Sequence, residues 1–313
     1  MEFKKLIDRK NELDRITTSL KREDTQFVVV YGRRRIGKST LLKHIVNTQE
    51  NAIYFLSDTS SETVQRAAFS KSASAVIDGF DKAIYPDWET FFRSLNQQLT
   101  SRTLVCIDEF PYLVKSCEAL PSIIQKLLNE KNLKFDLILC GSSQQLMHGY
   151  VLNKQSPLYG LANEIIKMQP IPFRYIGIAM ECDAIQAVKE FAIWGGVPRY
   201  WEVRRDYPDT ETAIRKVLLD PQGVLIEEPQ RLLRDDMRDT IQATSLLTII
   251  GNGANKPSEI ASRVGKDTSA ISEPLSKLCD LGYVCREVPF GENPKKSKKG
   301  LYHINDSLLR FHY

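Results

Sequence analysis

Residues 27–40 read FVVVYGRRRIGKST and join an apolar, β-branched run to a glycine-rich loop. Positions 32–39 match the pattern GxxxxGKS/T at every fixed position. Because glycine has no Cβ, the backbone can wrap a phosphate closely, and successive N–H groups then point inward. The N-terminus of a following helix adds positive potential. The stretch therefore predicts a strand, a phosphate-binding loop and a helix.

The side chains of this loop predict contacts with phosphate groups and with Mg²⁺. Lys38 can reach the β- and γ-phosphates of a nucleoside triphosphate, and the Ser39 hydroxyl can ligate Mg²⁺. The three arginines of residues 33–35 either stay solvated on their long stems or add attraction for the triphosphate. We predict ATP as the ligand, in contact with Gly32, Arg35, Ile36, Gly37, Lys38, Ser39 and Thr40.

An acidic pair follows a second apolar run. Residues 104–107 read LVCI and end in Asp108 and Glu109. We predict that Asp108 holds Mg²⁺, directly or through water, and that Glu109 is the general base that polarises an attacking water. The competing interpretation is a pair of solvated acids after a strand.

Short apolar runs alternate with helical periodicity through the first half of the chain. Such alternation is typical of a parallel sheet covered by helices on both faces, which makes a three-layer α/β sandwich. We predict strands at residues 27–31, 52–56, 104–107, 135–140 and 165–168, and helices at 39–47, 61–80, 88–99 and 122–130. The strand at 52–56, together with Glu109, is similar to the additional-strand, catalytic-glutamate branch of P-loop ATPases.

Gly141, Ser142 and Ser143 follow the fourth predicted strand. In the branch that the chain resembles, a polar residue at this strand end senses the γ-phosphate, which indicates Ser142 first and Ser143 second. The alternative is a helix N-cap for the residues from 144 onward. Both roles can hold at once.

The pattern changes after residue 172. Residues 173–235 show helical periodicity, interrupted by GGVP at 195–198. Helices are predicted at 240–250 and 256–264, a third over residues 271–281, and strands at 283–288 and 301–304 around a lysine-rich turn. Helix-turn-helix followed by a basic hairpin is the plan of a winged helix, which is often used on DNA.

Contact with duplex DNA is one of several interpretations of this segment. A winged helix can also serve as a protein-interaction or lid module, and the lysines can simply form a solvated hairpin tip. Pro274 must lie in the first turn of the third helix or kink it. The residues that would contact DNA are Ser269, Ser272, Lys277, Lys295, Lys296, Lys298 and Lys299.

Taken as a whole, the chain resembles the archaeal-type P-loop ATPase family, which is AAA-like and related to the signal-transducing ATPases with numerous domains (STAND). The resemblance is carried by residues 31–40, 107–112, 141–143, 156–160, 170–173, 195–200 and 302–311. It implies ATP binding, hydrolysis, and a helical lid whose Pro198 and Arg199 approach the nucleotide. Residues 195–198 can equally form a tight turn between helices.

Two departures from the family pattern bear on activity. The family usually has arginine where this chain has Leu161, so hydrolysis is expected to be slow unless another arginine substitutes. Family members also commonly continue into a further domain, and the sequence leaves open whether one follows Tyr313.

Composition narrows the class of protein further. Of 313 residues, 42% are apolar and 26% charged, which excludes a disordered or fibrous chain. The net charge of +4 is too small for whole-surface binding of nucleic acid, so a basic patch must be local. No apolar run approaches the roughly 18 residues of a membrane span. Scattered cysteines and the lack of an apolar leader predict a cytoplasmic protein without zinc or membrane partners.

Three segments follow from these patterns: a P-loop ATPase domain at 1–172, a helical lid at 173–235 and a winged helix at 236–313. We predict a Mg²⁺-dependent ATPase switch that couples nucleotide state to the winged helix and to a protein partner not identified by the sequence. The alternative is a DNA-binding or protein-interaction regulator in which nucleotide is a structural ligand with negligible turnover.

Overall fold

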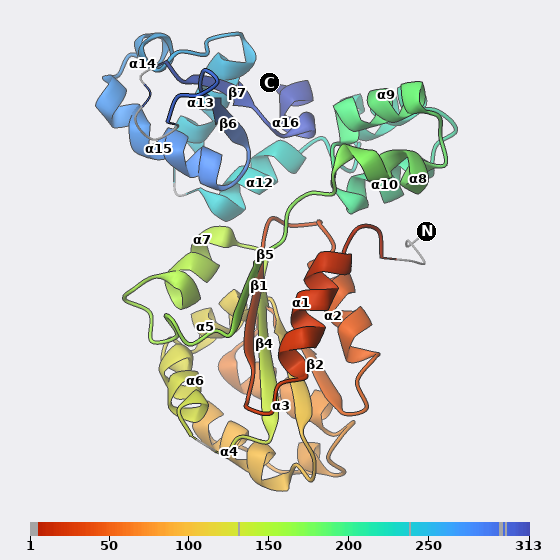
Figure 1. Ribbon diagram of the computed structural model, residues 1–313, viewed down its shortest axis with the longest axis vertical. Coiled ribbons are helices and arrows are strands. Elements are labelled where there is room, and N and C mark those ends of the chain that lie inside the picture. The colour runs from red at the N-terminus through yellow and green to blue at the C-terminus, as the bar shows by residue number, and fades with distance from the viewer. Residues whose placement is uncertain (1–5, 131, 238, 294–296, 298) are drawn as a thin grey trace. The chain divides into compact units, whose positions relative to one another are not determined.

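The computed structural model describes residues 6–130, 132–237, 239–293, 297 and 299–313 (Figure 1). Its described residues divide into two compact units, with the boundary between Gln169 and Pro170. Each unit has a hydrophobic core of its own. The further division of the second unit at residue 235 stays a prediction.

A parallel sheet forms the centre of the first unit. Within the described residues it has five strands in the order β2-β3-β4-β1-β5, and every neighbouring pair is parallel. The predicted α/β class is therefore confirmed, with small shifts at the strand ends. The strands are β1 Phe27–Tyr31, β2 Ala52–Leu56, β3 Thr103–Asp108, β4 Phe135–Gly141 and β5 Glu164–Lys167.

The strand that lies between β1 and β3 in the sheet is β4, and not the strand at 52–56 that lies between them in the sequence. Strand β2 lies between β1 and β3 in the sequence, but β4 lies between them in the sheet and β2 is at the edge. The chain skips two strand positions after β1 and fills them later. The carboxyl ends of β1, β4 and β3 are consecutive at one edge of the sheet as a result.

Helices cover both faces of the sheet (Figure 1). Helices α1 (Lys10–Leu20) and α2 (Lys38–Val46) pack against each other and against the strands on one face. Alternate strand residues such as Val29, Ile53 and Val105 point to the other face, where they join a core with aromatic side chains. That face is covered by α3 Glu62–Ala73, α4 Trp88–Gln98, α5 Phe110–Ser116 and α6 Leu120–Leu128.

The helix predicted at 61–80 is too long. Helix α3 ends at Ala73, and a separate 3₁₀ turn occupies Phe80–Lys82. Gly79 has a φ of 73°, a left-handed conformation that a continuing helix cannot contain. Helix α5, which the sequence patterns did not predict, starts directly after Glu109 and has a proline in its first turn.

The second unit is helical at its start and ends in a mixed segment. Helix α16 packs against both α9 and α12, so the end of the chain is integral to this unit. Its α-helices are α8 Ile176–Met180, α9 Ala184–Trp194, α10 Pro198–Arg205, α11 Thr210–Ala213, α12 Glu228–Asp236, α13 Thr240–Gly251, α14 Pro257–Val264, α15 Thr268–Asp280 and α16 Ser307–His312. A 3₁₀ turn occupies Phe173–Tyr175 and a π-helical segment Ile214–Leu219.

Helices α13 to α15 share one core with the antiparallel strands β6 (Val284–Glu287) and β7 (Leu301–Ile304). The interpretation of this segment as a winged helix stays a prediction. Pro274 lies inside α15, beyond its first turn, where it cannot donate a hydrogen bond to the carbonyl of Ala270. Within the part of the chain that the structure describes, no helix combines the length and apolar character needed to cross a membrane.

Candidate functional site

The glycine-rich loop connects β1 to α2 in a tight arch. Gly32 has a φ of 152°, and a Cβ built there would lie 2.5 Å from the carbonyl oxygen of Met168. Gly37 is left-handed, with a φ of 90°. Arg35 is also left-handed, with a φ of 68°, although it carries a side chain. Glycine thus lets the loop pass close to the Met168 carbonyl at position 32 and take a left-handed turn at position 37.

Lys38 starts helix α2 and turns back over this loop. The residue is only 5% exposed, and its Nζ donates a hydrogen bond of 2.8 Å to the carbonyl oxygen of Arg33. The ammonium group therefore lies within the arch. Ser39 and Thr40 follow it in the first turn of α2, and Ile36 is fully buried beneath the loop.

Arg9 anchors the loop from the residue that precedes α1. Its Nη2 donates to the carbonyl oxygens of Ile36 at 2.9 Å and of Gln169 at 3.0 Å. Glu12 pairs with its Nη1 at 3.1 Å. Burial lowers the pKa of the Arg9 guanidinium, and Glu12 opposes that shift. Arg9 therefore joins the loop to Gln169, which lies two residues after the end of β5.

Replacement of this anchor has a predictable effect on stability. We expect Arg9→Met to lower the free energy of unfolding of the first unit by about 2 kcal/mol, because two carbonyl groups lose a charged donor at a buried position. Urea denaturation followed by tryptophan fluorescence measures this loss. Arg15→Met is the matched control: Arg15 lies on α1, is 47% exposed and pairs with Glu164, so its removal should cost less than about 1 kcal/mol. Equal losses in the two variants would contradict the anchoring role.

The acidic pair lies at the carboxyl end of β3. Asp108 is fully buried, and its Oδ1 accepts a 2.9 Å hydrogen bond from the backbone N–H of Glu109. Its Oδ2 accepts one of 2.7 Å from the hydroxyl of Tyr54 on β2. Burial, and then the negative charge of Asp108, raises the pKa of the Tyr54 phenol far above its ordinary value. The interpretation of these acids as freely solvated does not fit Asp108.

Glu109 and Ser142 meet across the ends of β3 and β4. The Ser142 hydroxyl donates to Oε2 of Glu109 at 2.8 Å, and its backbone N–H approaches the same oxygen at 3.3 Å. Glu109 holds a left-handed conformation with a φ of 54°, uncommon for a residue with a side chain. The helix cap belongs to Ser143, whose hydroxyl accepts from the N–H of Leu146 on α7 (Gln144–Met147). The two adjacent serines thus have separate contacts.

Two tyrosines lie beside the loop and the acidic pair. Neither was predicted as a site residue, although Tyr112 is the last residue of the motif at 107–112. Arg34 donates from Nη2 to the hydroxyl of Tyr112 on α5 at 2.7 Å. Tyr54 reaches Asp108 as described, and Ser39 lies close enough to its hydroxyl to influence its pKa. A tyrosine in a strand, on the sheet face that α2 covers, could have indicated a nearby polar site residue, because a buried hydroxyl usually finds a hydrogen-bond partner.

The remaining predicted residues lie in the second unit. Pro198 occupies the first turn of α10, Ser269, Ser272 and Lys277 lie on α15, and the Ser272 hydroxyl donates to the carbonyl of Thr268. Lys299 donates to Glu292 at 2.9 Å, so this charge is compensated within the hairpin. Lys295, Lys296 and Lys298 lie outside the described residues.

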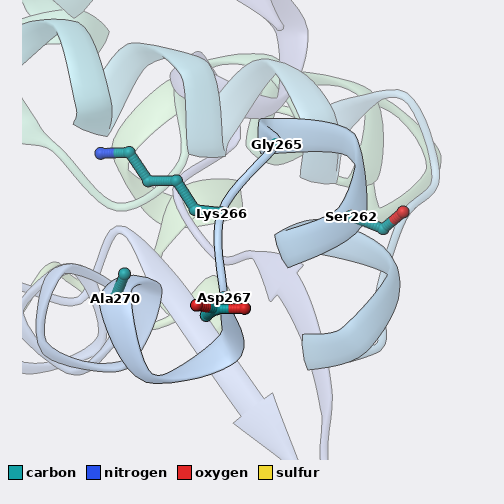
Figure 2. Close-up of a pocket in the computed structure, with 5 residues that line it drawn as sticks. All are labelled: Ser262, Gly265, Lys266, Asp267 and Ala270. Carbon is teal, nitrogen blue, oxygen red and sulfur yellow. The ribbon is translucent and has the colours of Figure 1, made fainter.

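A surface hollow lies at the turn between α14 and α15, and none of the described residues predicted to contact DNA lines it. Figure 2 shows its lining, which is Ser262, Gly265, Lys266, Asp267 and Ala270. Asp267 is at the N-cap of α15, where its carboxylate disfavours a bound phosphate group. Lys266 adds one positive charge to the same lining, so the net charge of the hollow does not favour a phosphate group.

The donors around the loop fit a magnesium ion held together with a nucleotide. Mg²⁺ in such sites commonly takes one or two protein oxygens, and substrate phosphates and water supply the rest. Asp108 offers a buried carboxylate and Ser39 a hydroxyl on the neighbouring helix. Among the residues that the structure describes, no group of three or more His, Cys, Asp or Glu side chains forms an all-protein metal cage.

Comparison with known proteins gives one family and several related chains. A family described as an ATPase domain predominantly from Archaea matches residues 6–177. An uncharacterized protein of Methanocaldococcus jannaschii is 31% identical over an alignment of 326 positions, which covers 98% of this chain and 68% of that protein.

Solved structures show the same fold at low sequence identity. A Walker-type ATPase of Pyrococcus abyssi has a TM-score of 0.68 at 20% identity, over 99% of this chain and 96% of that chain. The Aeropyrum pernix ORC2 protein, solved in ADPNP-ADP complexes, has a TM-score of 0.61 at 13% identity, over 100% of this chain and 93% of that chain.

Proposed function

Because the chain belongs to the family of ATPase domains found predominantly in Archaea, we propose that it binds ATP with Mg²⁺ and hydrolyses it to ADP and phosphate. The observation that carries the proposal is the arrangement at one edge of the sheet. Lys38 in its glycine-rich arch, the acidic pair and Ser142 come from the consecutive strand ends of β1, β3 and β4. ATP itself is suggested by the family and by the ADPNP-ADP complexes of the ORC2 protein.

In the proposed complex the loop binds the triphosphate. Backbone N–H groups of residues 32–37 and the Lys38 ammonium would face the β- and γ-phosphates. To reach them, Lys38 would exchange its hydrogen bond to the Arg33 carbonyl for one to a phosphate oxygen. Ser39 and Asp108 would hold Mg²⁺, which neutralises phosphate charge when bound.

Hydrolysis needs a base and a group that recognises the γ-phosphate. Glu109 would take the proton of the attacking water, and Ser142 would contact the γ-phosphate. The two side chains are hydrogen-bonded to each other at 2.8 Å, so each would change partner when nucleotide enters. This exchange is our proposed basis for a nucleotide-dependent switch.

This chain has Leu161 at the position where the family that it resembles usually has an arginine. Leu161 is partly buried and packs against the core of the first unit. Turnover is therefore proposed to be slow, below the about 10 s⁻¹ that is typical of enzymes. We propose that the second unit carries a winged helix in α13 to β7 that responds to nucleotide state, with duplex DNA or a protein as its partner.

Phosphate release from ATP, measured at steady state, tests this function. We expect ATP turnover in the presence of Mg²⁺ and its loss in EDTA. Duplex DNA is expected either to raise the turnover rate or to leave it unchanged. Tight nucleotide binding without turnover, both with and without DNA, would instead support the alternative, a regulator that uses nucleotide as a structural ligand.

A further inference from the structure

We infer that Tyr54 is a positioning residue of the metal site, and that it sets the orientation of the Asp108 carboxylate for Mg²⁺. This inference rests on the proposed function. Tyr54 belongs to β2, the edge strand next to β3, and its side chain reaches the carboxyl end of that neighbour. None of the sequence motifs that carry the family resemblance includes it.

Both oxygens of the Asp108 carboxylate accept a hydrogen bond from a neighbouring group. The backbone N–H of Glu109 binds Oδ1 at 2.9 Å, and the Tyr54 hydroxyl binds Oδ2 at 2.7 Å. Two donors on opposite oxygens fix the rotation of the carboxylate plane about its side-chain bond. A carboxylate has about four lone-pair sites, so these bonds leave acceptor capacity for a cation.

Tyr54 is itself held in place on the side of α2. Lys43 lies over its ring, with Nζ 5.7 Å from the ring centroid. Ser39, the other proposed magnesium ligand, lies close to its hydroxyl. The phenol therefore touches Asp108 and approaches Ser39, so its loss should affect the geometry between the two ligands.

Such positioning predicts a dependence on the kind of metal ion. Mg²⁺ demands near-ideal octahedral geometry, whereas Ca²⁺ accepts a flexible coordination sphere. Partners that orient a metal ligand typically change metal affinity 10- to 100-fold. A misoriented Asp108 should therefore weaken the Mg²⁺ complex more than the Ca²⁺ complex, and should leave metal-free nucleotide binding unchanged.

Calorimetric titration of the full chain with ADPNP measures this dependence in EDTA, Mg²⁺ and Ca²⁺. For Tyr54→Phe we expect the affinity gain from Mg²⁺ to fall by about 10-fold, the gain from Ca²⁺ by less than about 3-fold, and the affinity in EDTA to stay within about 2-fold. Tyr85→Phe is the matched control, since it removes a buried phenol that donates to the Phe80 carbonyl at 3.0 Å, between α3 and α4.

A double-variant comparison separates positioning from a general loss of structure. Adding Tyr54→Phe to Asp108→Asn should weaken the Mg²⁺ complex by no more than about 2-fold beyond Asp108→Asn alone, because both changes act on one interaction. Urea denaturation verifies that each variant is folded.

The outcomes distinguish this inference from the proposed function. If the wild-type chain gains affinity from Mg²⁺ and Tyr54→Phe gains as much, the positioning role is wrong and the function stands. Equal losses for EDTA, Mg²⁺ and Ca²⁺ would also overturn it. If the wild-type chain binds no ADPNP, the proposed function fails and the inference fails with it.

Discussion

Lys38→Ala is expected to bind ATP about 100-fold more weakly than the wild-type chain. The change removes a buried ammonium group, and hydrogen bonds to charged groups contribute about 1.5–3 kcal/mol each. A loss of about 2.7 kcal/mol corresponds to 100-fold in the dissociation constant. Lys38 is only 5% exposed, and its ammonium group is already hydrogen-bonded to the Arg33 carbonyl of the loop.

Titration with ADPNP and Mg²⁺ measures this loss without interference from turnover. Lys126→Ala is the control, because Lys126 is 64% exposed on α6 and makes a 3.7 Å surface ion pair with Glu89. Its removal should leave affinity within about 2-fold, as expected for a screened surface charge. An affinity of Lys38→Ala close to the wild-type value would mean that the loop does not bind phosphate through this residue.

Glu109→Gln is expected to bind ATP with nearly wild-type affinity and to lose about 10²–10⁴-fold in turnover, the usual contribution of a general base. The amide has the same shape as the carboxylate and can still accept the Ser142 hydroxyl, but it cannot take a proton from water. The left-handed backbone at this position is equally strained for both side chains, so the variant should fold.

Single-turnover and steady-state phosphate release measure the effect, and ADPNP titration verifies binding. Glu89→Gln is the control for removal of one carboxylate in the same unit, since Glu89 is a partly exposed ion-pair partner of Arg93 on α4. Hydrolysis by Glu109→Gln at the wild-type rate would show that another group activates the water. Lys38→Ala thus tests binding, and Glu109→Gln tests the chemical step.

The sequence by itself was sufficient for the features that depend on neighbours along the chain. The five strands were predictable because buried apolar runs and the intervening helical periodicity are local patterns. The loop at 32–39 was predictable because its glycine and lysine positions have a fixed spacing. The helix predicted at 61–80 is wrong beyond Ala73, where α3 ends, and Gly79 then takes a left-handed conformation.

The tertiary structure alone decided which of these features meet. Strand order depends on how the chain crosses the sheet, so β4, and not β2, separates β1 from β3. The same crossings bring Tyr54 to Asp108, 54 residues away, and Ser142 to Glu109, 33 residues away. No spacing rule encodes such contacts, because they follow from packing of elements that are remote in the sequence.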